Sequence, residues 1–259
     1  REREMVLDVF ELVSGQRMMT TFFRPGGLWR DVPDDFELAV RRFLRMFPAR
    51  IDMYHALLTK NPIFMDRTRN IGVINAEDAV RWGLTGPAVR GSGPAIDLRK
   101  MQPYSGYEQY EFDIPTGTHG DVYDRYLVRM EEMRQSLRIV QQALDKLPLG
   151  PVRSNDRKYV PPPRAALGTS MEALIHHFKL WTEGFQLPQG AVYSPVESPK
   201  GELGVYLESD GGTRPLRVHW RTPSFVHLQA LPVLSRGHLV ADLVGIIGSI
   251  DIVLGDSDR

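Results

Sequence analysis

The chain has 259 residues, of which 42% are hydrophobic and 25% charged, and its 32 basic side chains are balanced by 32 acidic ones. This composition is that of an ordinary globular protein, and the balanced charge gives no general basic field for nucleic acid. The absence of cysteine excludes disulfides, thiolate nucleophiles and cysteine-ligated metal or iron–sulfur sites within the chain.

The first predicted element is an amphipathic helix over Arg3–Met18. The helical pattern already includes the first residues, and the sequence does not begin with Met. The apolar core and the cleavage site of a signal peptide are absent. We therefore expect the chain to lack its N-terminal part. A turn follows at Pro25-Gly26-Gly27, where proline and glycine favour a change of direction.

A second helix is expected to begin near Pro33 and to run to Leu58, interrupted or kinked at Pro48. The segment Asn61–Ile74 is expected to be a short extended piece. Asn75 then has the properties of an N-cap for a helix that reaches Trp82.

The stretch Gly83–Gly120 is rich in Gly, Pro and Tyr and carries no regular pattern. Segments of this length without regular structure are uncommon in compact domains and tend to be functional or to lie against a partner. Its Arg90-Gly91-Ser92-Gly93 run lacks both the GxGxxG and the GxxxxGKS/T spacing, so we reject nucleotide binding there.

Residues 119–147 carry the strongest pattern and predict one long central helix. Apolar or aromatic residues recur at spacings of three and four, at Tyr123, Tyr126, Met130, Met133, Leu137, Val140, Leu144 and Leu147. Such a helix would be about 40 Å long, and Pro148 would end it. Arginines and glutamates lie mostly off this stripe, so we expect a packing helix with a solvated or partner-facing flank.

The C-terminal half begins with a proline-rich connector over 151–168 and a helix that opens near Met171. The expected apolar face of that helix consists of Met171, Leu174, Ile175, Phe178 and Trp181. Over 191–220 the period changes to two, which predicts a small antiparallel β meander. Residues 221–259 are expected to form terminal helices and a tail. The predicted fold class is mainly α with this small antiparallel β meander.

Few residues carry a chemical signal. His176 and His177 are adjacent on a helix and point about 100° apart, and no HExxH or HxxxH spacing is present, so structural roles are expected. Asp251 is more informative because it follows an almost wholly apolar helix, where a carboxylate is costly to desolvate. The alternative is a carboxylate that caps the helix or pairs with a nearby arginine. Lys200 lies in a predicted turn, and the sequence alone indicates an ordinary exposed lysine there.

Several collinear runs together resemble one known family. They are Phe23-Arg24-Pro25-Gly26-Gly27, Leu84-Thr85-Gly86-Pro87 with Arg90-Gly91-Ser92-Gly93, Tyr123–Ser136, Met171-Glu172 with Ile175-His176-His177-Phe178-Lys179, Glu197-Ser198-Pro199-Lys200-Gly201-Glu202, Ser209–Pro215 and the Asp258-Arg259 terminus. They resemble the 49-kDa-type subunit of NADH:quinone oxidoreductase, the family in respiratory complex I that is homologous to the large subunit of [NiFe]-hydrogenases.

The resemblance implies a [NiFe]-hydrogenase large-subunit-like helical core, in one domain over 1–259. It implies a peripheral-arm protein packed against the partner with the terminal iron–sulfur cluster, and a quinone cavity between them at the junction with a membrane-arm subunit. Iron–sulfur clusters and FMN would belong to partner subunits, with no metal or flavin on this chain. The location would be the cytoplasmic face of a bacterial cell membrane. By position, Asp251 and Val253 match the family's cavity-lining tail, and Lys200 matches a lysine of the same region.

Two departures from the family pattern qualify the resemblance. The family's main quinone ligands, a histidine and a tyrosine, would precede Arg1, so the fragment alone is expected to be inactive. Met19 stands where many relatives have histidine.

The absence of the hydrogenases' cysteines excludes a Ni–Fe centre and disfavours a membrane-bound hydrogenase. The remaining alternative is a scaffold protein of a ferredoxin-dependent relative that has no NADH module.

Overall fold

The computed structural model describes residues 1–258, which form two compact units. Unit 1 consists of Arg1–Phe47, Lys146–Val192 and Leu207–Arg217. Unit 2 consists of Pro48–Asp145, Tyr193–Tyr206 and the chain from Val218 onwards. The single domain expected over 1–259 stays a prediction, and Arg259, the last residue of the expected tail, lies outside the described residues.

Unit 1 contains short elements joined by long connections. They are α1 (Glu2–Ser14), β1 (Phe23–Arg24), β2 (Gly27–Leu28), the first part of α2 (Phe36–Tyr54), the 3₁₀ helix η3 (Arg164–Gly168) and α8 (Met171–Thr182). Helix α1 ends before the predicted Met18 because Gly15 adopts the left-handed conformation, with φ 78°, that terminates helices. The predicted apolar face of α8 is exposed, with each of its five side chains at least 49% accessible.

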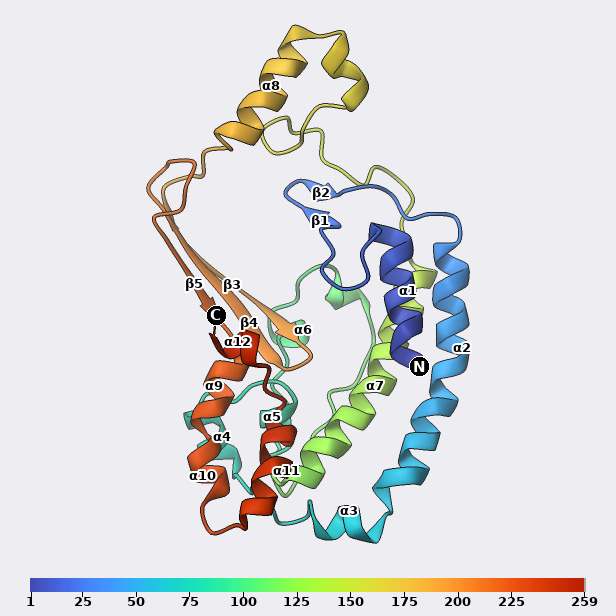
Figure 1. The fold of residues 1–259 in the computed structure, drawn as a ribbon, viewed down its shortest axis with the longest axis vertical. Coiled ribbons are helices and arrows are strands. Elements are labelled where there is room, and N and C mark those ends of the chain that lie inside the picture. The colour runs from blue at the N-terminus through green and yellow to red at the C-terminus, as the bar shows by residue number, and fades with distance from the viewer. Residues whose placement is uncertain (259) are drawn as a thin grey trace. The chain divides into compact units, whose positions relative to one another are not determined.

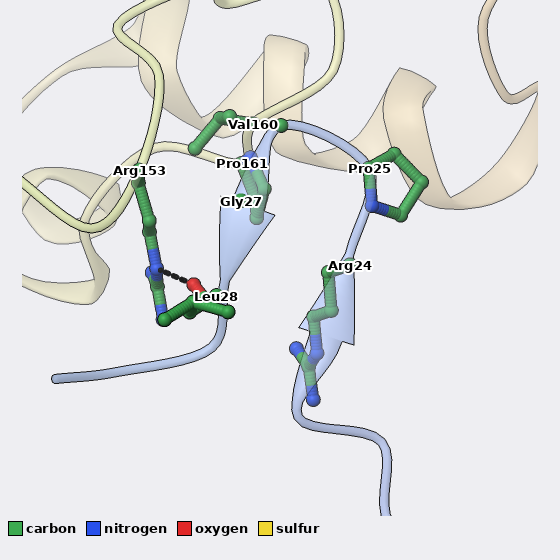
Figure 2. Close-up of a pocket in the computed structure, with 8 residues that line it drawn as sticks. Arg24, Pro25, Gly27, Leu28, Arg153, Val160 and Pro161 are labelled. Atoms are coloured by element: carbon green, nitrogen blue, oxygen red, sulfur yellow. Dashed lines mark hydrogen bonds between the residues drawn. The ribbon is translucent and has the colours of Figure 1, made fainter. Parts of the chain in front are cut away.

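The Pro25-Gly26-Gly27 turn joins β1 to β2, and the 151–168 connector packs against it (Figure 2). The backbone N–H of Leu28 donates to Val152 O at 2.9 Å, and Arg153 Nε donates to Leu28 O at 2.8 Å. A Cβ atom on Gly27 would lie 2.4 Å from Val152 O. The second glycine is therefore required by the close approach of the connector as well as by the turn.

Two details of the region after α1 differ from the expectations. Helix α2 is not interrupted at Pro48, and the alternative of a kink there stays a prediction. Regular α geometry ends at Tyr54, and His55–Thr59 form a π-helical segment. The extended piece expected over 61–74 contains helix α3 (Pro62–Asp66) instead. The local reason is the Asn61 side chain, which accepts hydrogen bonds from the backbone N–H groups of Ile63 and Phe64, with proline in the first turn.

Unit 2 is built around α7 (Val122–Asp145). Its other helices are the second part of α2, the π-helical segment η1 (His55–Thr59), α3, α4 (Ala76–Arg81), α5 (Pro87–Arg90), α6 (Leu98–Met101), the 3₁₀ helix η2 (Tyr107–Gln109), α9 (Pro223–Gln229), α10 (Leu231–Ser235), α11 (Val240–Ile250) and α12 (Leu254–Asp258). Helix α11 lies beside the N-terminal part of α7 (Figure 1). The core between them includes the buried Val122, Ile246 and Ile250.

Helix α7 begins three residues later than the pattern suggested. The carboxylate of Asp121 accepts from the backbone N–H groups of Asp124 at 2.7 Å and Asn70 at 2.9 Å, which fixes the start. All four residues of the first turn, Val122–Arg125, are buried. The predicted apolar stripe is followed only in part, because Val140 is 40% exposed while Arg125 is fully buried.

The meander expected over 191–220 is present as β3 (Gly190–Ser198), β4 (Gly201–Ser209) and β5 (Arg217–Arg221), in that order in the sheet. Only Pro199 and Lys200 separate β3 from β4, and so short a connection requires antiparallel pairing. The predicted fold class, mainly α with a small antiparallel β meander, is confirmed. Within residues 1–258, the helices are all too short or too polar to traverse a lipid bilayer.

Candidate functional site

An ion pair in unit 2 joins two of the three candidate residues. Lys200 Nζ lies 2.8 Å from Asp251 Oδ1 and 3.1 Å from the main-chain oxygen of Asp251, across 51 positions of sequence. The two side chains are 28% and 40% exposed, so the pair is partly accessible from the surface. Val253, the third candidate, lies two residues further along the tail and is 45% exposed.

Asp251 occupies the C-cap of α11 in the left-handed region, with φ 54° and ψ 49°. Aspartate is among the few non-glycine residues that visit this region readily. The alternative interpretation of Asp251 is therefore correct in kind, because the residue ends the helix and is salt-bridged, although its partner is a lysine. This geometry turns the carboxylate out of the apolar helix and toward the turn that carries Lys200.

The Lys200 turn is held against the loop before α5 by two glycines. A Cβ atom on Gly86 would lie 2.5 Å from the Cα of Gly201, and a Cβ atom on Gly201 would lie 2.5 Å from Thr85 Oγ1. The backbone N–H of Glu202 also donates to Thr85 Oγ1 at 3.0 Å. The segments 84–87 and 197–202, which both contribute to the family resemblance, therefore contact each other through their backbones.

His227 on α9 joins the same loop to the end of α11, and no sequence pattern pointed to it. The backbone N–H of Thr85 donates to Nε2 at 3.1 Å, so the ring proton lies on Nδ1 and donates to Ile250 O at 3.4 Å. The ring is fully buried, and this burial lowers the pKa of His227 to about 4. The imidazole is therefore neutral at physiological pH.

The tail beyond Asp251 is fixed by Ser224 in the first turn of α9. Ser224 Oγ accepts from the backbone N–H of Val253 at 3.3 Å, and the backbone N–H of Ser224 donates to Asp256 Oδ2 at 3.1 Å. With His227 bonded at Ile250, the segment that carries Asp251 and Val253 is anchored at both ends.

Helix α7, which packs against α11, carries buried arginines. Arg125 is fully buried and donates from Nε to Ser249 Oγ at 3.0 Å, from Nη1 to Gly120 O at 2.8 Å and from Nη2 to Gly72 O at 2.9 Å. Burial and the neighbouring Arg129 lower the pKa of Arg125 to about 10, so it stays charged at neutral pH. Its bond to Ser249 ties α7 to α11 two residues before Asp251, and its other two bonds hold the backbone at Gly72 and Gly120.

Arg90, in the run rejected as a phosphate loop, is the centre of a buried ionic cluster. Its Nη1 lies 2.8 Å from Glu197 Oε1 and 3.6 Å from Asp97 Oδ2, and its Nη2 is bonded to Glu132 on α7. Burial would raise the pKa of Asp97, but hydrogen bonds from Arg99 hold it below its usual value. The cluster connects α5, α7 and the end of β3, which is a structural role.

Metal coordination has no support in the part of the chain that the structure describes, where no group of three or more His, Asp or Glu side chains could hold an ion. The chemistry available at the tail is an ammonium–carboxylate pair on an anchored backbone. The ammonium of such a pair can donate a hydrogen bond to a neutral carbonyl ligand.

Comparison with known proteins defines the class. The family described as the 49 kDa subunit of respiratory-chain NADH dehydrogenase matches residues 1–259, and the chain belongs to this family. It is 60% identical over 262 residues to a D subunit of NADH-quinone oxidoreductase in Roseiflexus sp. strain RS-1. It is 54% identical to the D subunits of the same enzyme in Geotalea uraniireducens, over 259 residues, and in Rhodospirillum rubrum, over 258. The whole chain is covered in each case, and it spans 63% of the Roseiflexus relative and 66% of the other two.

Proposed function

We propose that this chain is part of the 49-kDa-type subunit of an NADH:quinone oxidoreductase and that Lys200, Asp251 and Val253 line its quinone cavity. The carrying observation is the partly exposed Lys200–Asp251 ion pair, whose aspartate lies on a tail that is anchored at both ends. The names of the relatives favour this function over the scaffold of a ferredoxin-dependent enzyme, because they are NADH-quinone oxidoreductase subunits.

In this proposal the chain contributes cavity walls, and its partners contribute the redox centres. Two electrons reach the quinone from an iron–sulfur cluster in the neighbouring peripheral-arm protein, and two protons complete the quinol. NADH and FMN bind elsewhere in the assembly. A membrane-arm subunit closes the cavity where quinone enters, on the cytoplasmic face of the cell membrane.

The ammonium group of Lys200 is a suitable hydrogen-bond donor for the quinone carbonyl. A lysine ammonium carries three N–H groups. Within residues 1–258, two of them are directed at Asp251, at 2.8 and 3.1 Å, which leaves the third for a ligand on the exposed side. The carboxylate orients the ammonium, and Val253 supplies an apolar surface for the ring beside it.

The test is Asp251→Ala and Asp251→Asn in the full-length, assembled enzyme. Asparagine also tolerates the left-handed conformation, so Asp251→Asn removes the charge with little change in the backbone. Quinone reduction should fall at least tenfold in both variants, a loss of about 1.4 kcal/mol in transition-state stabilisation. NADH oxidation by ferricyanide should remain intact.

Asp34→Asn is the control, because Asp34 is an exposed aspartate in unit 1. It should leave both activities unchanged. Normal quinone reduction in Asp251→Ala and Asp251→Asn would remove the support for a cavity role of the tail.

A further inference from the structure

The guanidinium of Arg129 on α7 is a buried group that the proposed function does not use. Its Nε and Nη2 are inaccessible to water and have no hydrogen-bond partner among residues 1–258. The remaining nitrogen, Nη1, donates only a long bond of 3.3 Å to Arg125 O. A buried charged group with unused donors is costly, and this cost usually marks a functional constraint.

The helix geometry directs Arg129 toward the tail. Arg125 and Arg129 are four residues apart on α7 and therefore lie on the same face, about 6 Å apart along the axis. Arg125 is bonded to Ser249 on α11, and Asp251 follows Ser249 by two residues. Figure 1 shows that α7 and α11 run in the same general direction, so one turn along α7 from Arg125 leads toward the end of α11 that precedes Asp251.

Among the charges around Arg129, Asp251 is the acid that is not already held by an arginine. Glu132, on the same helix, is bonded to Arg90 of α5. Burial lowers the pKa of Arg129. The negative charges of Asp251 and, to a smaller extent, Glu132 raise this pKa, and the positive charge of Arg90 lowers it further. The Asp251 carboxylate uses Oδ1 for Lys200.

We propose that Arg129 is a positioning residue of the quinone site: its positive charge attracts the Asp251 carboxylate from the α7 side, so that the carboxylate is held between Arg129 and Lys200. This inference rests on the proposed function. Lys200 then faces the ligand with a fixed orientation, because its partner cannot swing away. Arg129 itself does not touch the quinone.

The experiment is a double-mutant cycle in the full-length, assembled enzyme, with Arg129→Met and Asp251→Asn. Arg129→Met removes the charge and keeps a long side chain. The KM for a short-chain quinone should rise on the order of tenfold in the single variant, with ferricyanide reduction unchanged. In the Asp251→Asn background the same substitution should change KM by less than about twofold, because the group that it positions is gone.

Two further variants separate positioning from packing. Arg129→Lys keeps the charge and should restore KM to within about threefold of the wild type, which a purely structural role would not predict. Arg134→Met is the matched control on the same helix, where Arg134 pairs with the exposed Asp52. It should leave KM unchanged.

The outcomes distinguish this inference from the proposed function. If Asp251→Asn leaves quinone reduction unchanged, the proposed function fails. If Asp251→Asn impairs it but Arg129→Met has no effect on KM, or adds its full effect in the double variant, only the positioning role fails. If neither Arg129→Met nor Arg129→Lys assembles, Arg129 is structural and the positioning role is overturned.

Discussion

The neutral imidazole of His227 links the backbone N–H of Thr85 to the carbonyl of Ile250, the residue before Asp251. This one buried side chain therefore bonds to two segments: the loop that packs on the Lys200 turn, and the tail that carries Asp251. The position of the ion pair therefore depends on a residue that touches neither of its members.

His227 should make the stability of the protein vary with pH. Its pKa is about 4 in the folded state and near 6.5 in an unfolded chain, so the unfolded state binds the proton more tightly. Stability is then complete above pH 6.5 and is lost as the pH falls toward 4. Between pH 7.5 and 5 this group alone should remove about 2 kcal/mol from the free energy of unfolding.

Urea denaturation of the full-length protein at pH 7.5 and 5 measures this effect. His227→Gln keeps one donor and one acceptor without titrating, so the pH-dependent difference should shrink by most of that amount. The exposed His219 on β5 provides the control His219→Gln, which should leave the difference unchanged. An unaltered pH dependence in His227→Gln would show that other groups cause it.

Gly201→Ala should displace the Lys200 turn. The added Cβ would lie 2.5 Å from Thr85 Oγ1, so the turn or the loop must move. Gly211→Ala is a matched control, because Gly211 also has a positive φ, 97°, but nothing lies within 4 Å of its Cβ position. Both substitutions strain the backbone, and only the first creates a steric overlap.

The expected result is a larger loss of stability in Gly201→Ala, by about 1–3 kcal/mol relative to Gly211→Ala. Quinone reduction by the assembled enzyme should fall only in Gly201→Ala. Equal melting temperatures and equal activities in the two variants would contradict the close packing of the turn.

Local signals in the sequence were sufficient for several elements, but not for α3, or for α5, α6 and η2 in the stretch 83–120 that was expected to be irregular. Asn75 and Ser170 accept hydrogen bonds from backbone N–H groups at the start of α4 and α8, as capping residues do. The change to a period of two marked the meander, and Pro199 with Lys200 marked its first turn. These features depend on neighbours within a few residues, so a single sequence contains them.

Long-range contacts between polar groups were not predictable in the same way. Nothing near Arg125 in the sequence shows that three acceptors from Gly72, Gly120 and Ser249 surround it, so the charged residues of α7 were expected on a solvated or partner-facing flank. The partner of Arg90 at Glu197 lies 107 positions away. Such residues bury their charge only because the fold assembles compensating groups, and neighbouring residues in the sequence do not reveal those pairs.

The Lys200–Asp251 pair offers a last test, because stability and activity should respond differently. Both side chains are partly exposed, and exposed ion pairs contribute about 0–1 kcal/mol to folding. Lys200→Met should therefore lower the free energy of unfolding by no more than about 1 kcal/mol. It should nevertheless reduce quinone reduction at least as strongly as Asp251→Asn, because it removes both the carboxylate's partner and the ligand's donor.

Lys200→Arg separates charge from geometry. Arginine retains the charge and can reach a carboxylate, but its planar fork cannot reproduce the three tetrahedral donors of an ammonium. Quinone KM should therefore lie between the values of the wild type and Lys200→Met. Denaturation midpoints and KM would be measured on the same preparations. A Lys200→Met variant with a large loss of stability and normal KM would identify the pair as a structural brace of the α11 tail.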